Sequence, residues 1–227
     1  GADRRHDGGR RGVSASLFAP QGEPWAERLS AGAVLLHGWA LPQDAELCAE
    51  VDAVIGQAPL RGMETPGGQS MSVATSSCGD WGWVSDRGGY RYSASDPQTG
   101  QAWPRMPARL LRLAGDAAAA AGFPGFAPDA CLINCYQPGA RMGLHQDKDE
   151  RDFSAPIVSV SLGLPAVFLL GGLRRADRAL KIALEHGDVL VWGGEDRMRF
   201  HGVQPVKPGV HPLLGARRLN LTFRKAR

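Results

Sequence analysis

The sequence lacks several features that would place the protein in other structural classes. None of its apolar runs approaches the roughly 18 residues that a membrane-spanning helix needs. No signal-peptide pattern opens the chain, and its cysteines form no C-x-x-C pair of the zinc-ribbon or thioredoxin kind. We therefore expect a soluble, cytoplasmic protein with no membrane partner, in which Cys48, Cys78, Cys131 and Cys135 are reduced, buried thiols.

Charge is also scarce. Charged residues make up 22% of the chain and the net charge is +3, so a nucleic-acid partner would have to be bound by a local basic patch. The hydrophobic fraction of 43% is enough for a well-buried core. Thirty glycines and sixteen prolines predict many turns, which favours short strands over long helices.

The first 130 residues and the remainder differ in character. Residues 1–16 are rich in Gly, Ser and Arg, which predicts a disordered basic tail. Apolar residues at helical spacing predict helices at 42–57 and 107–121, the first ended by Pro59 and the second by Gly122. Between these helices, residues 60–104 carry many Gly, Trp, Tyr, Ser and Thr residues, which indicates hairpins and loops with projecting aromatic side chains.

From Cys131 onward the pattern changes to short β-rich runs separated by Gly, Pro or Asp. The predicted strands are 131–136, 143–147, 157–162, 166–170, 180–185, 188–192, 200–204 and 217–224. This is the number of strands in a double-sheet jelly roll. We predict one α+β, mainly β domain over 17–227, in which 131–227 form the jelly-roll core and 17–130 supply helices and a cover over its mouth.

The segment 144–150 (LHQDKDE) carries the first candidate metal ligands. In a strand, residues i and i+2 point to the same face, so His145 and Asp147 can present an imidazole and a carboxylate to one cation. His201, which follows a strand and a Gly-Gly turn, can supply a second imidazole from a distant strand. Two histidines and one carboxylate on one octahedral face are typical of non-haem Fe(II) oxygenases.

Each part of this pattern has a plainer interpretation when taken alone. A chain with six histidines often contains an H-x-D sequence by chance, and a lone His201 is more often a hydrogen-bonded core histidine than a ligand. The spacing to the last predicted strand changes that balance.

The last strand alternates between two kinds of side chain. Arg218, Asn220, Thr222 and Arg224 fall on one face, and Leu219, Leu221 and Phe223 fall on the other. Burying the polar face would be costly without an anionic partner, and a dicarboxylate is such a partner. We expect Arg224 to clamp its distal carboxylate and Arg218 to lie near the carboxylate that chelates iron. A solvated polar face with the apolar face inward is the alternative.

Taken jointly, H-x-D, a distant His and R-x-N-x-x-x-R about 17 residues later resemble the AlkB family of nucleic-acid dealkylases. The resemblance runs from about Trp25 to the C-terminus. Its further motifs are TPGG at 65–68, DPQT at 96–99, PDACLIN at 128–134, LHQDKDE at 144–150, APIVSVSLG at 155–163 and EHGDV at 185–189.

The resemblance implies a double-stranded β-helix (jelly roll) with N-terminal helices and a nucleotide-recognition lid. It also implies Fe(II), 2-oxoglutarate and O2 as the reaction partners. The iron ligands would be His145, Asp147 and His201. The residues implied to contact 2-oxoglutarate are Asn134, Tyr136, Arg218, Asn220 and Arg224.

The substrate that the resemblance implies is alkylated DNA, single-stranded by preference, or RNA, with no obligate protein partner. A base must leave the stack to reach a buried iron, and the family resemblance implies that Trp83 stacks on it opposite His145 while Asp149 faces its edge. A carboxylate there can favour cationic lesions such as 1-methyladenine and 3-methylcytosine. Implied contacts to phosphates or sugars are Thr65, Tyr90, Arg141, Gln146, Lys148 and Arg175. Without the resemblance, core filling is the favoured explanation of the aromatic residues, and a solvated charged face explains the arginines and Lys148 as well as function does.

Four residues depart from the family pattern: Gln69, Thr75, Cys135 and Leu219. None belongs to the expected metal or co-substrate set, so we expect them to bear on the range of lesions and on DNA against RNA. Two rival functions share part of the pattern. A dioxygenase for a small molecule or protein would need the iron and the arginines but not Trp83 or Asp149, and a non-enzymatic binding module would need neither set intact.

Overall fold

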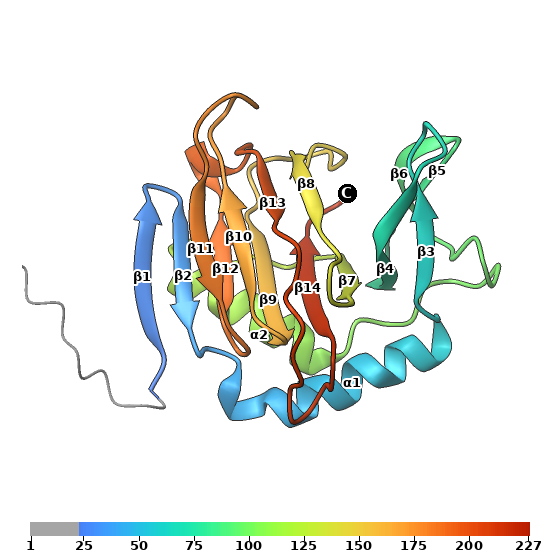
Figure 1. Ribbon diagram of the computed structural model, residues 1–227, viewed down its shortest axis with the longest axis horizontal. Helices are drawn as coiled ribbons and strands as arrows, with labels where there is room; N and C mark the ends of the chain where they lie inside the picture. Colours follow the sequence, from blue (N-terminus) through green and yellow to red (C-terminus); the bar gives the residue numbers. More distant parts are fainter. Residues whose placement is uncertain (1–22) are drawn as a thin grey trace, which may run out of the picture.

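An eight-stranded antiparallel sheet is the largest element of the computed structural model, which describes residues 23–227 (Figure 1). The expected tail at 1–16 lies outside the described residues. In spatial order the strands of this sheet are β1 (Trp25–Ser30), β2 (Ala33–His37), β12 (Val189–Trp192), β9 (Ile157–Gly163), β14 (Arg218–Arg224), β7 (Ala130–Tyr136), β4 (Ser70–Gly79) and β3 (Arg61–Glu64).

A four-stranded sheet faces the central part of the large one. Its order is β11 (Leu180–Leu184), β10 (Ala166–Leu170), β13 (His201–Val203) and β8 (Met142–His145). Apolar side chains of both sheets, among them Leu190, Phe168 and Ile182, pack together between them. Two facing antiparallel sheets form the jelly roll that the sequence predicts, and the mainly β fold class is confirmed.

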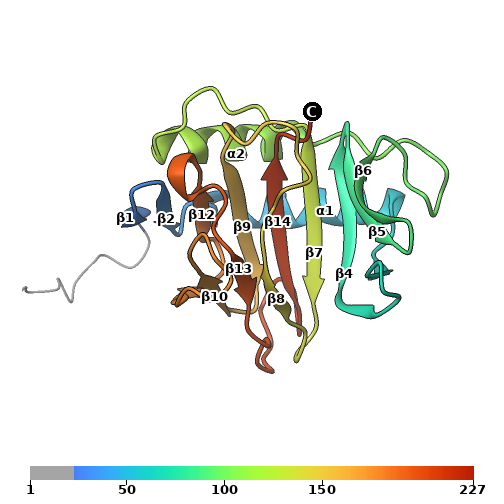
Figure 2. The same cartoon turned by 90° about the horizontal axis from the view of Figure 1, so that it is seen from above.

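Two helices cover the other face of the large sheet. They are α1 (Asp44–Gln57), preceded by the 3-10 turn η1 (Leu41–Gln43), and α2 (Ala108–Ala120). Leu47 of α1 and Leu110 of α2 are fully buried against a core that includes Ile133 and Leu221 of the sheet. Figure 2 shows α2, the large sheet and the small sheet as successive layers.

Strand alternation decides which side chains face the cavity between the sheets. On β14, Leu219, Leu221 and Phe223 lie in the core beneath the helices, as period-2 alternation predicts. Arg218, Asn220, Thr222 and Arg224 therefore point the other way and line a cavity between the sheets. The alternative of a solvated polar face on this strand is excluded, because all seven residues are buried.

The sequence prediction located the C-terminal strands and both helices within a few residues, but it missed the N-terminal strands. Residues 33–37 (AVLLH) show no alternation, because β2 is an inner strand between β1 and β12 with both faces covered. Together with β3 and β4, these strands extend the large sheet at both edges. Strands from both sides of residue 130 therefore build the large sheet.

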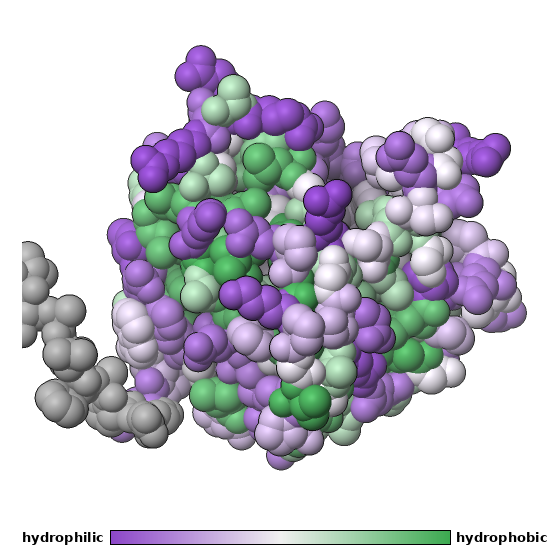
Figure 3. Space-filling model, in the orientation of Figure 1, coloured by the Kyte–Doolittle hydropathy of each residue, from purple (hydrophilic) through white to green (hydrophobic). Residues whose placement is uncertain are grey.

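A separate hairpin stands beside the large sheet. It consists of β5 (Gly82–Asp86) and β6 (Gly89–Ser93), paired only with each other, next to β4 in both views (Figures 1 and 2). On the opposite side, the loop between β10 and β11 projects from the small sheet and is strongly hydrophilic (Figure 3). Arg174, Arg175 and Arg178 are exposed in this loop.

Two further expectations concern the cysteines and membranes. All four cysteines are buried and free, as predicted. Among residues 23–227, no helix has both the length and the apolarity that crossing a bilayer requires.

Asp196, in the 3-10 turn η2 (Gly194–Asp196), fastens the β1–β2 turn to the chain after β12. Its carboxylate accepts hydrogen bonds from the hydroxyl of Ser30, the backbone N–H of Gly32 and Nε of Arg199, each at 2.6 Å. The Asp196 side chain is almost completely buried. These contacts make it the main polar link at this edge of the sheet.

We predict that Asp196→Ala lowers the free energy of unfolding by about 2–4 kcal/mol, because it leaves buried donors without an acceptor. Denaturant unfolding followed by circular dichroism measures this. As a control, Asp52→Ala breaks only an exposed contact with Arg217 at 3.3 Å and should change the value by less than about 0.5 kcal/mol. Equal losses in the two variants would contradict the assignment.

Candidate metal centre

Two histidines and one aspartate converge at one end of the small sheet. His201 on β13 is the direct cross-strand partner of His145 on β8, so the register brings the imidazoles together. Nε2 of each histidine lies 3.6 Å from Oδ1 of Asp147. One nitrogen or oxygen atom from each of the three residues lies within 4.8 Å of the others, which is close enough to hold one metal ion.

The route by which Asp147 reaches this place differs from the prediction. The expected strand at 143–147 ends at His145, and Asp147 lies in the loop that follows. The shared strand face therefore does not explain the pair. The loop is held instead by the Arg197 side chain, which donates a buried hydrogen bond to the carbonyl oxygen of Asp147 at 2.7 Å.

Both imidazoles are oriented by backbone carbonyl groups. Nδ1 of His145 lies 2.8 Å from the carbonyl oxygen of Gly143, and Nδ1 of His201 lies 3.1 Å from that of Arg199. A carbonyl oxygen only accepts, so each Nδ1 carries the proton and donates it. The Nε2 lone pairs are then free to face the carboxylate, which is the tautomer that metal ligation requires.

The electrostatics of the cluster favour metal binding at neutral pH. Burial, and secondly the neighbouring His201, lower the pKa of His145 to about 4. Although 35% of its side chain is exposed, Nε2 faces Asp147 within the cavity. Burial alone would raise the pKa of Asp147, but Arg224, His201 and His145 together hold it well below its usual value. His145 is therefore a neutral imidazole and Asp147 a carboxylate.

A cavity of about 460 Å³ extends from these three side chains between the sheets. It collects nearly all of the site residues that the sequence predicts. Besides the metal ligands, the predicted residues that line it are Trp83, Tyr90, Asn134, Tyr136, Gln146, Lys148, Asp149, Arg175, Arg218, Asn220 and Arg224.

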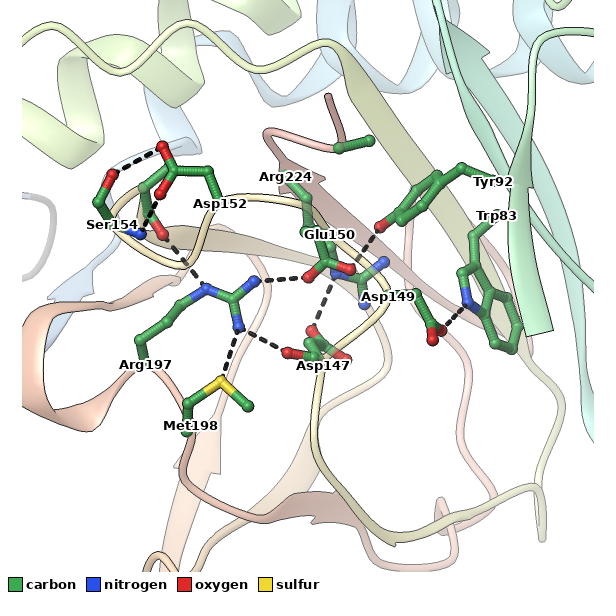
Figure 4. A network of polar contacts seen from close by, with 12 residues as sticks. Trp83, Tyr92, Asp147, Asp149, Glu150, Asp152, Ser154, Arg197, Met198 and Arg224 are labelled. Atoms are coloured by element: carbon green, nitrogen blue, oxygen red, sulfur yellow. Dashed lines mark hydrogen bonds and ion pairs between the residues drawn. The ribbon is translucent and has the colours of Figure 1, made fainter.

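The two arginines of β14 lie in different surroundings. Nε of Arg224 donates to Oδ2 of Asp147 at 2.9 Å, so this guanidinium is in contact with a metal ligand (Figure 4). Arg218 lies six residues away, about 20 Å along an extended strand. There Nη2 donates to the hydroxyl of Ser161 at 3.1 Å, and the guanidinium carbon is 5.8 Å from the centre of the Tyr136 ring.

These positions are the reverse of those expected for the two arginines. Arg224 is at the metal end of the cavity, and Arg218 is at the far end. The sequence could not settle this point, because strand alternation says which residues share a face but not which end of the strand meets the metal.

Buried polar atoms at the far end fit a bound anion. Nε and Nη1 of Arg218 are buried with no hydrogen-bond partner among the described residues. Burial raises the pKa of the Tyr136 hydroxyl to about 12, so this group is a donor at neutral pH. Burial also lowers the pKa of Arg218, so a neighbouring anion would stabilise its charged form. Buried donors without acceptors are rare, and a carboxylate is the acceptor that a guanidinium prefers. The residues present therefore fit a metal ion and a dicarboxylate together.

The hairpin side of the cavity carries aromatic rings. Nε1 of Trp83 donates to Oδ2 of Asp149 at 2.8 Å (Figure 4). The ring of Tyr90 stacks on that of Trp83, with centres 5.5 Å apart and planes 15° apart. Tyr90 is 49% exposed, so a flat aromatic surface opens from the cavity to solvent.

The remaining predicted contacts lie at the rim or beyond it. Arg175 donates to the carbonyl oxygen of Leu144 at 2.7 Å, Gln146 donates to that of Met198 at 2.8 Å, and Lys148 is exposed. Two residues are outside the cavity. Thr65 accepts from the backbone of Gln69 in the β3–β4 turn, and Arg141 is exposed with its backbone bonded to Ser72. Neither residue lines the cavity, and their contacts to phosphates or sugars stay a prediction.

A buried network behind the metal ligands was not predicted. Arg197 forms an ion pair with Glu150, and the hydroxyl of Tyr92 donates to the other oxygen of Glu150 at 3.1 Å (Figure 4). All three side chains are buried. The charged run 147–150 contains Glu150, but its partners are 47 and 58 residues distant in sequence, so no local pattern indicates them.

The four departures from the family pattern lie away from the cavity lining. Gln69 is exposed in the β3–β4 turn, and Cys135 and Leu219 are buried in the core beneath the helices. Thr75 is fully buried on β4. None of the four residues lines the cavity.

Comparison with known proteins gives consistent results. Residues 32–224 match the family model of the 2OG-Fe(II) oxygenase superfamily. The chain is 56% identical over 210 residues to the alpha-ketoglutarate-dependent dioxygenase AlkB of Escherichia coli. The aligned residues cover 92% of this chain and 97% of that protein. It is 46% identical over 112 residues to the DNA N(6)-methyladenine demethylase ALKBH1D of Arabidopsis thaliana, covering 44% and 25% of the two chains. The solved structure of OsALKBH1 is similar with a TM-score of 0.77 and 30% identity, covering 88% of this chain and 99% of that one.

We predict that Asp147→Ala weakens Fe(II) binding by more than about 100-fold, because it removes one of the three ligands, and loss of supporting contacts alone weakens metal sites by ~10–100-fold. Anaerobic calorimetric titration with Fe(II) measures this. Asp152→Ala removes an exposed carboxylate from the same loop and should bind Fe(II) as the unaltered protein does. Unchanged affinity in Asp147→Ala would exclude the metal assignment.

The metal-free protein should lose stability as the pH falls from 6.5 towards 4. In the unfolded chain His145 takes up a proton near its ordinary pKa of 6.5, whereas in the folded protein it stays neutral down to about pH 4. The unfolded state thus binds more protons in this window, and folding is disfavoured there. Urea unfolding at several pH values should give a steeper pH slope for the unaltered protein than for His145→Asn. Identical slopes would show that His145 titrates normally.

Proposed function

The chain belongs to the AlkB family within the 2OG-Fe(II) oxygenase superfamily, and we propose from this membership and from its site that it removes alkyl groups from damaged nucleic-acid bases by oxidation. It is an Fe(II)- and 2-oxoglutarate-dependent dioxygenase. The observation that carries the substrate proposal is the hydrogen-bonded pair of Trp83 and Asp149 beside the metal ligands.

The metal is held by His145, Asp147 and His201 in this proposal. When bound, ferrous iron, 2-oxoglutarate and O2 supply the oxidation, in which the co-substrate becomes succinate and CO2 and the N-alkyl carbon is hydroxylated and released as formaldehyde. Three protein ligands on one face leave room for a bidentate 2-oxo acid and for O2. No protein side chain has to act as a nucleophile in this reaction.

In this proposal 2-oxoglutarate lies along β14, with Arg218 near one of its ends and Arg224 near the other. Arg218 and the hydroxyl of Tyr136 bind the distal carboxylate, because they are the buried donors at the far end of the cavity. Arg224 holds Asp147 in place and adds positive charge beside the carboxylate that chelates the metal. Asn134 and Asn220, linked at 3.4 Å, complete the wall between these ends.

The damaged base enters between the hairpin and the metal ligands. Trp83 supplies a flat apolar surface for a base that has left its stack, and His145 lies on the opposite side. The Asp149 carboxylate can exchange its bond to Trp83 for one to an exocyclic amino group. Its negative charge favours a base that alkylation has made cationic, such as 1-methyladenine or 3-methylcytosine.

Single-stranded DNA is the substrate form that suits this site best, with RNA as a second possibility. The cavity mouth combines the exposed ring of Tyr90 with Lys148 and Arg175 at the rim, and stacking next to basic groups is typical of single-strand binding. The Arabidopsis relative acts on DNA by its name. Four free, buried thiols and a nucleic-acid substrate fit a cytoplasmic location.

A test of the function is formaldehyde release from a single-stranded oligonucleotide that contains one 1-methyladenine. We expect release that requires Fe(II) and 2-oxoglutarate. We also expect Trp83→Ala to raise KM for the oligonucleotide roughly 5- to 100-fold, because base–aromatic stacking is worth about 1–3 kcal/mol. As a control, Trp25→Ala removes a half-exposed tryptophan on the edge strand β1 and should leave KM unaltered.

Other outcomes separate the rival functions. Turnover of 2-oxoglutarate only with small molecules or peptides would favour a dioxygenase of different specificity. Oligonucleotide binding without any turnover would favour a binding module.

A further inference from the structure

The last described residue, Arg227, connects three parts of the site that are far apart in the sequence. Its guanidinium carbon lies 5.4 Å from the centre of the Trp81 ring and 5.5 Å from that of the Tyr92 ring. Trp81 precedes β5 and Tyr92 lies on β6, so Arg227 touches both sides of the hairpin. The same guanidinium donates to the carbonyl oxygen of Asp149 at 3.2 Å.

The backbone holds Arg227 in this position. The buried carboxylate of Asp129 accepts from the backbone N–H groups of Ala226 at 2.6 Å and of Arg227 at 3.1 Å. The carbonyl oxygen of Ala226 accepts from the N–H of Arg151 at 3.1 Å. Hydrogen bonds to Asp129 and Arg151 therefore fix the backbone next to Arg227, and its half-buried side chain is held against the hairpin.

A second link joins the hairpin to the loop after β8, which carries Asp147, Asp149 and Glu150. Tyr92 donates to Glu150, which is paired with Arg197, and Arg197 also holds the carbonyl oxygen of Asp147 (Figure 4). In the sheets of the described chain, β5 and β6 pair only with each other. Side-chain hydrogen bonds also join the hairpin to Glu64 on β3 and to Trp103. Besides the Trp83–Asp149 hydrogen bond itself, the contacts of Arg227 and Tyr92 join the hairpin to the loop that carries Asp147.

We propose that Arg227 is a positioning residue for the part of the cavity that binds the base. By stacking on Trp81 and Tyr92 and binding the Asp149 carbonyl, it fixes the hairpin against the loop after β8, which carries Asp147. This inference rests on the proposed function. Arg227 does not line the cavity, so it acts through Trp83 and Asp149 and not on the substrate itself.

The planar guanidinium, rather than the charge alone, performs this role. A guanidinium can stack on two rings and still direct an N–H at a carbonyl oxygen, whereas a lysine ammonium is a point charge that cannot do both. A phosphate-binding arginine would behave differently, because lysine would replace it well and its loss would lower the salt dependence of binding. The two roles are therefore separable by experiment.

The experiment measures KM and kcat for formaldehyde release from the methylated oligonucleotide at several salt concentrations. We expect Arg227→Ala to raise KM roughly tenfold, with kcat changed less than threefold and the salt slope unaltered, because a hairpin without its cation–π contacts holds Trp83 less firmly against the base. Arg227→Lys should also raise KM several-fold. Arg112→Ala, which removes an exposed arginine from α2, controls for the change in net charge.

Hydrogen exchange gives a readout that does not depend on activity. In Arg227→Ala, the amides of residues 81–93 should exchange faster, while those of β9 and β14 should not change. Tyr92→Phe, which removes only the second link, should show the same effect. Faster exchange throughout the protein would indicate a merely structural role and overturn the proposal.

The outcomes distinguish this inference from the proposed function. If the unaltered protein releases no formaldehyde, the function fails, and hydrogen exchange still decides whether Arg227 fixes the hairpin. If the unaltered protein is active, normal KM in Arg227→Ala would overturn the inference alone. An Arg227→Lys variant with normal KM, together with a lowered salt slope in Arg227→Ala, would assign Arg227 to phosphate binding instead.

Discussion

The structure depends on one cluster of charge: Asp147 is buried among Arg224, His145 and His201. A buried carboxylate is stable only beside compensating charge and donors, and Arg224 provides both at 2.9 Å. Burial and the neighbouring His201 lower the pKa of His145, so it is neutral, and Nε2 of each histidine lies 3.6 Å from the carboxylate. A neutral His145 and an ionised Asp147 are the forms in which these two side chains bind a divalent cation.

The double-sheet architecture makes this cluster possible. The large sheet brings Arg224 from β14, and the small sheet brings the cross-strand pair of His145 and His201. Covering the outer face of the large sheet with helices leaves its inner face free for polar residues. Arg218 at one end of β14 and Arg224 at the other then line opposite ends of the cavity, and Arg224 contacts the metal ligand Asp147.

Much of the site could be predicted from the sequence, because period-2 alternation places Arg218, Asn220 and Arg224 on one face whatever the topology. The short strand at 33–37 could not, since an inner strand with both faces buried has no alternation. Which of the two arginines lies beside the metal ligands depends on which end of β14 meets them. The contacts of Glu150 with Arg197 and Tyr92, and of Arg227 with Asp149 and the hairpin, join residues at least 47 positions apart and exist only in the folded chain.

The most direct measurement of the central claim is an anaerobic titration of the Fe(II)-loaded protein with 2-oxoglutarate, in the unaltered chain and in Arg218→Met. If metal and dicarboxylate share the cavity along β14, the unaltered protein binds 2-oxoglutarate far more tightly with Fe(II) than without it. Arg218→Met then loses roughly 100-fold in affinity for 2-oxoglutarate while retaining its Fe(II), because it removes a charged hydrogen bond of ~1.5–3 kcal/mol together with its compensation of a buried carboxylate. Binding of 2-oxoglutarate that needs neither Fe(II) nor Arg218 would contradict the claim.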